Sequence, residues 1–273
     1  MSQILFIDNL SFKYHEKSVL KDISFSTNPG EFISIIGPNG CGKTTLIKII
    51  SKINKPEKGN IYIKDKNIQT MSNKQLARHI AVVMQSPEPV SMSVEEYVLL
   101  GRLPFFKKYQ FFETAKDISL AHKYMELTGI LKLAHAPINE ISGGERQLAA
   151  IARALTQEPM LLILDEPTSH LDITHQIQIL ELISSLKKTL SISVLMVIHD
   201  LNLAAEYSDR LVLLNGKNGT IYQTGTCEQV LSEESIQEVY QTTVIIQKNP
   251  VSKRPCLFLV SQNALNQKEN PVL

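Results

Sequence analysis

The stretch G-P-N-G-C-G-K-T-T, residues 37–45, combines residue types that bind phosphate. Its glycines let backbone N–H groups converge on an anion. Lys43 is spaced to reach the β and γ phosphates, and Thr44 to offer its hydroxyl to Mg²⁺. The pattern predicts a nucleoside triphosphate site, whose residues would be Gly37, Pro38, Asn39, Gly40, Cys41, Gly42, Lys43, Thr44 and Thr45.

Two carboxylates follow an apolar run at residues 160–164. A continuous apolar run is typical of a parallel strand buried on both faces, and such strands present polar groups at their carboxyl ends. Asp165 suits a Mg²⁺ shell, and Glu166 suits polarising a water for attack on the γ-phosphate. Two acids that merely complement a helix dipole are the alternative.

Two more predicted strands, residues 80–84 and 193–198, end in polar side chains. The amide oxygen of Gln85 could ligate Mg²⁺ or orient water, and His199 could sense the γ-phosphate. The alternatives are a plain strand-end amide and a structural histidine. Either way, both are predicted at the edge where ligands bind in open α/β sheets.

A second helix start suited to an anion begins at Ser142. Ser142 and Glu145 form a capping box, while Gly143 and Gly144 leave first-turn N–H groups open. The stretch has no lysine, so a simple helix start explains it equally well.

The sequence also predicts the strands and helices that position these side chains. The apolar strand 32–36 precedes the glycine-rich loop, and an amphipathic helix follows it through 46–50. Residues 1–30 alternate like strands over 4–7, 10–14 and 19–25, which predicts an antiparallel sheet in front of the core. Tyr14 in this region could stack on a base or be an ordinary strand aromatic.

From residue 86 to about 159 the pattern becomes helical and interrupts the strand series. Helices are predicted from Ser93, over 112–128 and 130–134, and from Ser142 to Ala154, which indicates an inserted helical subdomain. Phe105, Phe106, Phe111 and Phe112 could form a partner surface or belong to loop and helical core.

The rest of the chain completes one α/β domain, expected over 1–260 with a polar tail at 261–273. We predict a helix at 173–190, a hairpin at 211–222, a helix at 232–240 and strands near 244–246 and 257–260.

Composition sets mild bounds on function. The 273 residues contain 28 Lys and Arg against 27 Asp and Glu, so no nucleic-acid partner is expected. We expect no signal peptide and no membrane span, hence a soluble cytosolic chain that could dock on a membrane protein. The cysteines Cys41, Cys227 and Cys256 are expected as free thiols, and the remaining histidines show no metal spacing.

Together the motifs resemble those of the ATP-binding cassette family, the nucleotide-hydrolysing subunits of ABC transporters. The resemblance covers residues 1 to about 230. It rests on Walker A at 37–45, the Q-loop at Gln85, the signature at 141–147, Walker B at 161–165 with Glu166, the D-loop at 169–172, the switch residue His199 and the A-loop residue Tyr14. Two positions depart from the family pattern: Ile141 replaces the usual leucine, and Cys41 adds a thiol beside the phosphates, which predicts sensitivity to alkylation.

The resemblance implies a P-loop NTPase fold: a RecA-like core, an N-terminal antiparallel β subdomain and an α-helical subdomain inserted at about 87–158. It implies a head-to-tail homodimer that clamps ATP and Mg²⁺ between Walker A of one copy and the signature of the other. Glu166 would be general base, Lys43 and Mg²⁺ would neutralise charge, and His199 would position the γ-phosphate. Metal ligands would be Thr44, Gln85 and Asp165. The partner copy would contribute Ser142, Gly143, Gly144, Glu145 and Asp172.

Residues 101–104 and 170–176 look like the branch that serves iron chelate, heme and cobalamin importers. The branch implies two ATPase subunits with two membrane permeases, served by a substrate-binding protein, at the cytoplasmic face of the inner membrane. Residues 86–104 would receive the permease. A molybdate importer, a non-transport ABC ATPase and a regulatory module without turnover stay open, although a single Walker A and the intact Glu166 and His199 disfavour the last two.

Overall fold

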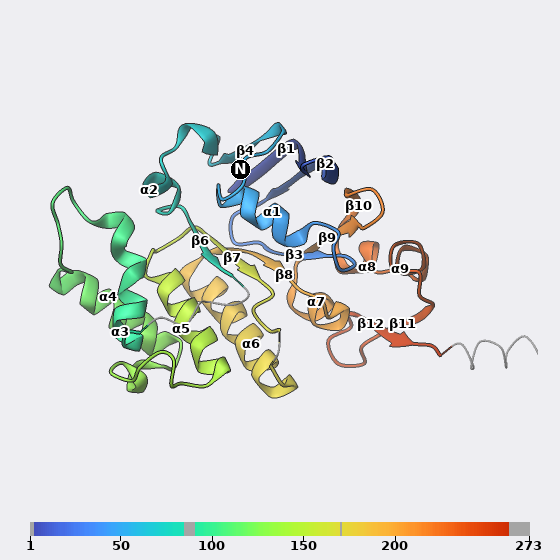
Figure 1. The fold of residues 1–273 in the computed structure, drawn as a ribbon. Coiled ribbons are helices and arrows are strands. Elements are labelled where there is room, and N and C mark those ends of the chain that lie inside the picture. The colour runs from blue at the N-terminus through green and yellow to red at the C-terminus, as the bar shows by residue number, and fades with distance from the viewer. Residues whose placement is uncertain (1–2, 85–90, 170, 262–273) are drawn as a thin grey trace, which may run out of the picture.

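The computed structural model describes residues 3–84, 91–169 and 171–261 (Figure 1). Its largest sheet is mixed and six-stranded, and β10 is its antiparallel edge strand. The order across this sheet is β10 (Thr220–Gly225), β9 (Arg210–Asn215), β3 (Phe32–Ile36), β8 (Ser193–Val197), β7 (Leu161–Asp165) and β6 (Ile80–Val83).

The predicted N-terminal antiparallel sheet is confirmed. It runs in the order β2 (Lys17–Thr27), β1 (Leu5–Tyr14), β4 (Lys58–Ile63) and β5 (Lys66–Asn67). The prediction of two separate strands at 4–7 and 10–14 is wrong, because β1 is continuous. Its pairing shifts register near Asn9, whose φ is 47°, so a bulge absorbs the break in alternation.

The strands of the large sheet separate two apolar cores. Ile33 and Ile35 face the core shared with the antiparallel sheet and α1 (Lys43–Ile50), whereas Phe32 and Ile36 face the core on the other side. Alternate side chains of a strand point to opposite faces, so a strand that is apolar at every position must be covered on both. Helices α5 (Gly143–Leu155) and α6 (Ile173–Leu190) contribute to the second core.

A helical lobe lies beside the large sheet (Figure 1). It contains α3 (Val94–Leu99), α4 (Ala115–Leu127) and the start of α5, which pack against one another. Helix α4 begins three residues later than predicted because Thr114 caps it, accepting from the Asp117 N–H at 3.3 Å. The helix predicted at 130–134 is only a 3₁₀ turn, Leu131–Leu133.

The remaining elements are all short. They are α2 (Asn73–Leu76), α7 (Leu201–Tyr207), α8 (Cys227–Val230), α9 (Glu233–Tyr240), β11 (Val244–Lys248) and β12 (Pro255–Leu259), with 3₁₀ turns at Ile68–Thr70 and Leu100–Phe105.

The Gly101-Arg102 pair locks the lobe together. Arg102 is 4% exposed, and its Nε donates to Asp117 Oδ1 at 2.9 Å while Nη1 donates to the Thr156 carbonyl at 2.6 Å. A methyl group on Gly101 would lie 2.1 Å from the backbone oxygen of Arg153. These two residues therefore hold α4 and the end of α5 against the 3₁₀ turn that follows α3.

We expect Gly101→Ala to lower the free energy of unfolding by about 1–3 kcal/mol, because the added methyl group must displace backbone atoms in a packed interior. Urea denaturation of the two proteins measures the difference. Gly129→Ala is an informative comparison, since its Cβ would meet nothing within 4 Å and only its φ of 77° opposes the change. Equal stability of wild type and Gly101→Ala would contradict the close approach.

The Arg102–Asp117 pair also predicts a pH dependence. Burial by itself raises the pKa of Asp117, but hydrogen bonds from Thr114 and Arg102 outweigh it and hold this pKa below its usual 3.8. A carboxyl with a lowered native pKa gives stability that is present above its unfolded pKa and lost as pH falls through the native value. We expect Asp117→Asn to destabilise the chain more at pH 7 than at pH 3. A stability difference equal at both pH values, measured by urea denaturation, would remove Asp117 from this role.

Candidate active site

The loop between β3 and α1 curls into a cradle. Gly40 and Gly42 have φ of 77° and 101°, values that side chains rarely adopt. At Gly42 a Cβ would also lie 2.7 Å from Leu20 Cδ2, so only glycine fits where the loop passes β2. The cradle ends at the N-terminus of α1, where unpaired N–H groups favour an anion.

Lys43, the first residue of α1, is 4% exposed. Its Nζ donates to the carbonyl oxygens of Gly37 at 2.8 Å and Pro38 at 3.0 Å. The ammonium group thus lies within its own loop, so its charge is concentrated where phosphate would sit.

Thr44 and Asp165 meet at the carboxyl end of β7. Thr44 Oγ1 donates to Asp165 Oδ1 at 3.3 Å, and Asp165 Oδ2 is buried with no hydrogen-bond partner among the described residues. The pKa of Asp165 is raised above its usual value, mainly by burial. The hydrogen bond from Thr44 lowers this pKa but does not outweigh burial, and the nearby charge of Glu166 adds to the increase. A carboxylate with an unsatisfied buried oxygen beside a hydroxyl fits Mg²⁺, which prefers hard oxygen ligands.

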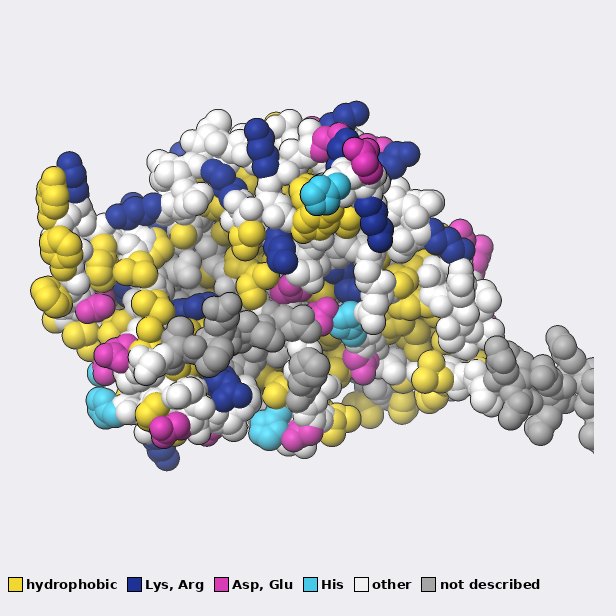
Figure 2. Space-filling view, viewed as in Figure 1, with side chains coloured by type: hydrophobic (Ala, Val, Ile, Leu, Met, Phe, Trp, Pro, Cys, Tyr) yellow, Lys and Arg dark blue, Asp and Glu magenta, His cyan; other side chains and the backbone are white. Residues whose placement is uncertain are grey.

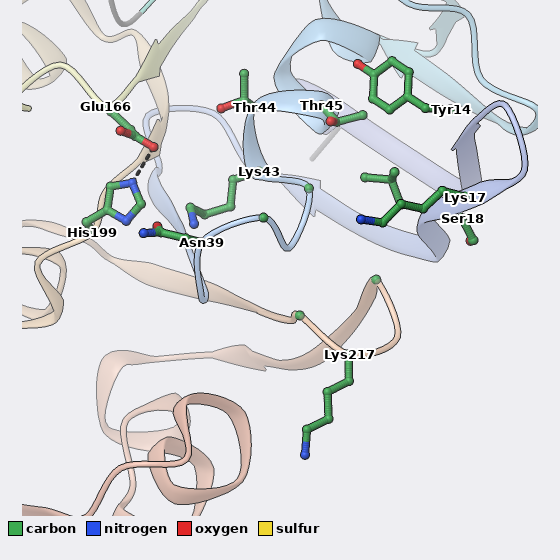
Figure 3. A pocket seen from close by; sticks show the side chains of 15 residues that line it. Tyr14, Lys17, Ser18, Asn39, Lys43, Thr44, Thr45, Glu166, His199 and Lys217 are labelled. Atoms are coloured by element: carbon green, nitrogen blue, oxygen red, sulfur yellow. Dashed lines mark hydrogen bonds and ion pairs between the residues drawn. The ribbon is translucent and has the colours of Figure 1, made fainter.

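Glu166 and His199 come from neighbouring parallel strands and meet side chain to side chain. Glu166 Oε1 hydrogen-bonds His199 Nε2 (Figure 3). The φ of Glu166 is 53°, and its N–H donates to the Val197 carbonyl at 3.1 Å. A left-handed backbone at a non-glycine residue costs energy and is common at functional sites. Here it follows the last residue of β7 and sets where the carboxylate lies.

One cavity of about 430 Å³ is lined by Lys43, Thr44, Glu166 and His199, whereas Asp165 is buried and does not line it (Figure 3). That size suits a nucleotide-sized ligand. Of the predicted residues, the cavity is lined by Tyr14, Asn39, Gly40, Gly42, Lys43, Thr44, Thr45, Glu166 and His199.

Tyr14 lies at one end of the cavity, on β1. Its hydroxyl accepts from Asn54 Nδ2 at 2.9 Å, and its ring meets Phe12 edge to face at 4.8 Å. The ring is 44% exposed and held in place from two sides, so it can offer a face to a planar ligand.

The outer wall of the cavity was not predicted from the sequence. It is formed by the start of β2 and by the turn between β9 and β10: Lys17, Ser18, Val19, Gly216, Lys217 and Gly219. The Lys21 N–H donates to the Gly219 carbonyl at 2.8 Å and so joins the two walls. Gly216 and Gly219 indicate a turn in the sequence. No local sequence pattern, however, shows that this turn contacts residues about 200 positions earlier in the chain.

The signature residues lie outside this cavity. Ser142 caps α5: its N–H donates to Glu145 Oε2 at 2.8 Å, and the Glu145 N–H donates back at 3.2 Å. Asp172 caps α6 and accepts from the His175 N–H at 2.9 Å. A Cβ on Gly144 would lie 3.3 Å from the ring of that histidine, so signature and D-loop are neighbours. Gln85 and His170 lie outside the described residues.

Cys41 belongs to the core and does not line the cavity. Its side chain is 1% exposed, and burial raises the pKa of its thiol more than the nearby Lys43 lowers it. Thiolate is the reactive form. The structure therefore argues against the predicted sensitivity to alkylation.

We expect iodoacetamide to modify Cys256, which is partly exposed, at least about tenfold faster than Cys41 in the folded chain at pH 7.5. Peptide mass spectrometry over time measures both rates. The urea-unfolded chain is the control, where the two rates should become similar. Early labelling of Cys41 in the folded chain would show that its burial is incomplete.

A glycine-rich phosphate cradle before a helix, with acids at the end of a neighbouring parallel strand, defines a P-loop nucleoside triphosphatase. The ABC transporter family matches residues 20–169. The chain belongs to this family, whose ATP-binding subunits bind and hydrolyse ATP.

Individual relatives agree over nearly the whole chain. An uncharacterised ABC transporter ATP-binding protein of Methanocaldococcus jannaschii is 41% identical over 89% of this chain and 94% of its own. The iron(3+)-hydroxamate import ATP-binding protein of Bacillus subtilis is 37% identical over 96% of each. A solved structure of a metal-chelate type ABC transporter in an inward-facing conformation has a TM-score of 0.83 and 26% identity, covering 96% of this chain and 99% of its own. Within the described residues, every helix is too short or too polar to cross a membrane.

Proposed function

We propose that this chain is the ATP-hydrolysing subunit of an importer for an iron siderophore or a related metal chelate. For hydrolysis, the observation that carries the proposal is the Glu166–His199 pair, which lines the same cavity as Lys43 and Thr44. For the cargo, support comes from the iron(3+)-hydroxamate relative, which matches along almost its full length.

The residues divide the reaction between them. The cradle N–H groups and Lys43 hold the β and γ phosphates. Thr44, Asp165 and Gln85 would hold Mg²⁺, which supplies neutralisation of phosphate charge when bound. Glu166 takes a proton from water as the water oxygen bonds to the γ-phosphorus and the bond to ADP breaks. His199, hydrogen-bonded to Glu166, would orient that carboxylate and position the γ-phosphate.

A second copy of the chain would complete each site. Ser142, Gly143, Gly144, Glu145 and Asp172 lie outside the cavity of their own chain, and a helix start with open N–H groups suits an anion. We propose a head-to-tail homodimer in which these residues close over ATP bound to the partner copy. Two permeases would carry the dimer at the cytoplasmic face of the membrane, with a substrate-binding protein acting through them.

ATP hydrolysis by the purified chain over a range of protein concentrations tests the dimer. We expect the rate per chain to rise with concentration, and a constant rate would remove the second copy from the site. For the cargo, ATP-driven uptake by the chain reconstituted with its permeases would compare ferric hydroxamate, heme, cobalamin and molybdate. Uptake of any of the last three, without ferric hydroxamate, would overturn the cargo proposal.

A further inference from the structure

The loop before α4 carries three of the most exposed aromatic side chains of the described residues. Tyr109, Phe111 and Phe112 are 78%, 79% and 81% exposed, and Lys107 and Lys108 precede them. We name residues 107–112 the aromatic tip. It projects from the helical lobe, where Figure 2 shows hydrophobic side chains beside basic ones at the left edge. Large exposed rings mark a binding surface because removing their apolar area from water is favourable.

The backbone of the aromatic tip is hydrogen-bonded within itself. The Gln110 N–H donates to the Lys107 carbonyl at 3.1 Å, and Gln110 Oε1 accepts from the Lys107 N–H at 3.0 Å. Gln110 Nε2 donates to the Phe112 carbonyl at 3.0 Å. These bonds pair part of the tip's backbone, the N–H groups of Lys107 and Gln110 and the carbonyls of Lys107 and Phe112, and so lower the cost of removing those groups from water at a lipid interface.

The base of the aromatic tip is fixed to the lobe. Lys74 Nζ hydrogen-bonds the Phe106 carbonyl, and Arg78 Nε donates to the Pro104 carbonyl at 2.8 Å. The Arg102 guanidinium lies 4.0 Å from the ring centre of Phe105. Phe105 and Phe106 are each only partly exposed, so the exposed aromatic surface is narrower than the four phenylalanines that the sequence suggested.

We propose that the aromatic tip binds the surface of an anionic lipid bilayer. Lys107 and Lys108 complement anionic headgroups, and residues 107–112 contain no Asp or Glu. Aromatic side chains settle at the level of the headgroups. The tip is convex, so a protein partner would need a pocket shaped to three projecting rings, whereas a bilayer interface deforms around them. This inference rests on the proposed function, since a subunit of a membrane importer works beside a bilayer. It gives the subunit a direct contact with the bilayer in addition to its contacts with the permeases.

Vesicle flotation of the purified full chain tests the charge requirement. We expect the chain to float with phosphatidylcholine vesicles that contain 30 mol% phosphatidylglycerol, and to do so weakly with phosphatidylcholine alone. Replacing Lys107 and Lys108 by Gln should weaken binding about 25-fold, at about fivefold for each lysine near the surface. The matched control replaces the exposed Lys64 and Lys66 by Gln and should change binding little. Equal losses in the two variants would overturn the assignment of the tip.

A tryptophan probe tests insertion directly, because the chain contains no tryptophan. We expect the fluorescence emission of Phe111→Trp to shift to the blue when anionic vesicles are added. The control is Phe258→Trp, at a half-exposed position of β12, whose emission should stay unchanged. No shift at position 111 would overturn the proposal. So would a shift that appears on concentrating the protein without vesicles, which indicates self-association, or only on adding the permeases, which indicates a protein partner.

ATP hydrolysis in solution separates this inference from the function on which it rests. The tip lies outside the cavity, so replacing Phe111 and Phe112 by Ser should weaken vesicle binding at least about tenfold while leaving the solution rate unchanged. If the wild-type chain hydrolyses ATP but does not bind anionic vesicles, only the proposal that the aromatic tip binds lipid is rejected. If the wild-type chain does not hydrolyse ATP, the proposed ATPase function is rejected, whatever the vesicle result.

Discussion

Replacing Glu166 with Gln is expected to lower the rate of ATP hydrolysis about 10²- to 10⁴-fold, the usual contribution of a positioned general base. The amide keeps the shape of the side chain and one oxygen toward His199, but it cannot take a proton from water. Lys43, Thr44 and the glycine cradle are untouched, so ATP binding should be retained. With binding intact and hydrolysis blocked, the proposed head-to-tail dimer should accumulate.

Phosphate release, ATP binding and size-exclusion chromatography with ATP measure these effects together. Glu126→Gln is the matched control, since Glu126 is exposed on α4 and outside the cavity. It should hydrolyse ATP at the wild-type rate. Normal turnover by Glu166→Gln would remove Glu166 from its role, and weak ATP binding by this variant would mean that the carboxylate supports the cavity instead.

The strands and the residues at their ends could be predicted because each signal is local. Residues 160–164 are apolar at every position, as a strand covered on both faces must be, and this places Asp165 and Glu166 at the ligand edge. The predicted helix at 173–190 matches α6, which Asp172 begins and Ser191 ends with a φ of 53°. Helix caps and the apolar pattern of strands depend on residues close together in the chain, so a single sequence is enough to predict them.

What the sequence did not reveal depends on contacts between distant segments. Lys17 and Lys217 line one cavity only because the β9–β10 turn lies against β2. Cys41 sits among phosphate-binding residues in the chain, yet its side chain turns into the core. Phe105 and Phe111 read alike in sequence, but the guanidinium of Arg78, which comes from a different segment, lies over the ring of Phe105, whereas Phe111 is 79% exposed. No periodicity encodes such contacts.

Replacing Lys43 with Ala is expected to reduce ATP hydrolysis about 10²- to 10³-fold, the cost of removing one preorganised group that stabilises transition-state charge. Unlike Glu166→Gln, it should also weaken ATP binding. Lys43 is 4% exposed and bonded to the Gly37 and Pro38 carbonyls, so its loss removes both a charge toward phosphate and a brace of the cradle. Titration of a fluorescent ATP analogue measures binding, and phosphate release measures turnover.

Lys188→Ala, at an exposed position of α6, is the control for loss of a lysine charge and should match wild type in both assays. Lys43→Arg should not rescue activity, because a planar guanidinium is larger than the ammonium group and cannot reproduce its hydrogen bonds to the Gly37 and Pro38 carbonyls while pointing at phosphate. Together the two catalytic variants separate the roles of the cavity: if Lys43→Ala lost turnover but bound ATP as tightly as Glu166→Gln does, Lys43 would act only in the transition state. The ground-state phosphates would then be held by the N–H groups of the cradle alone.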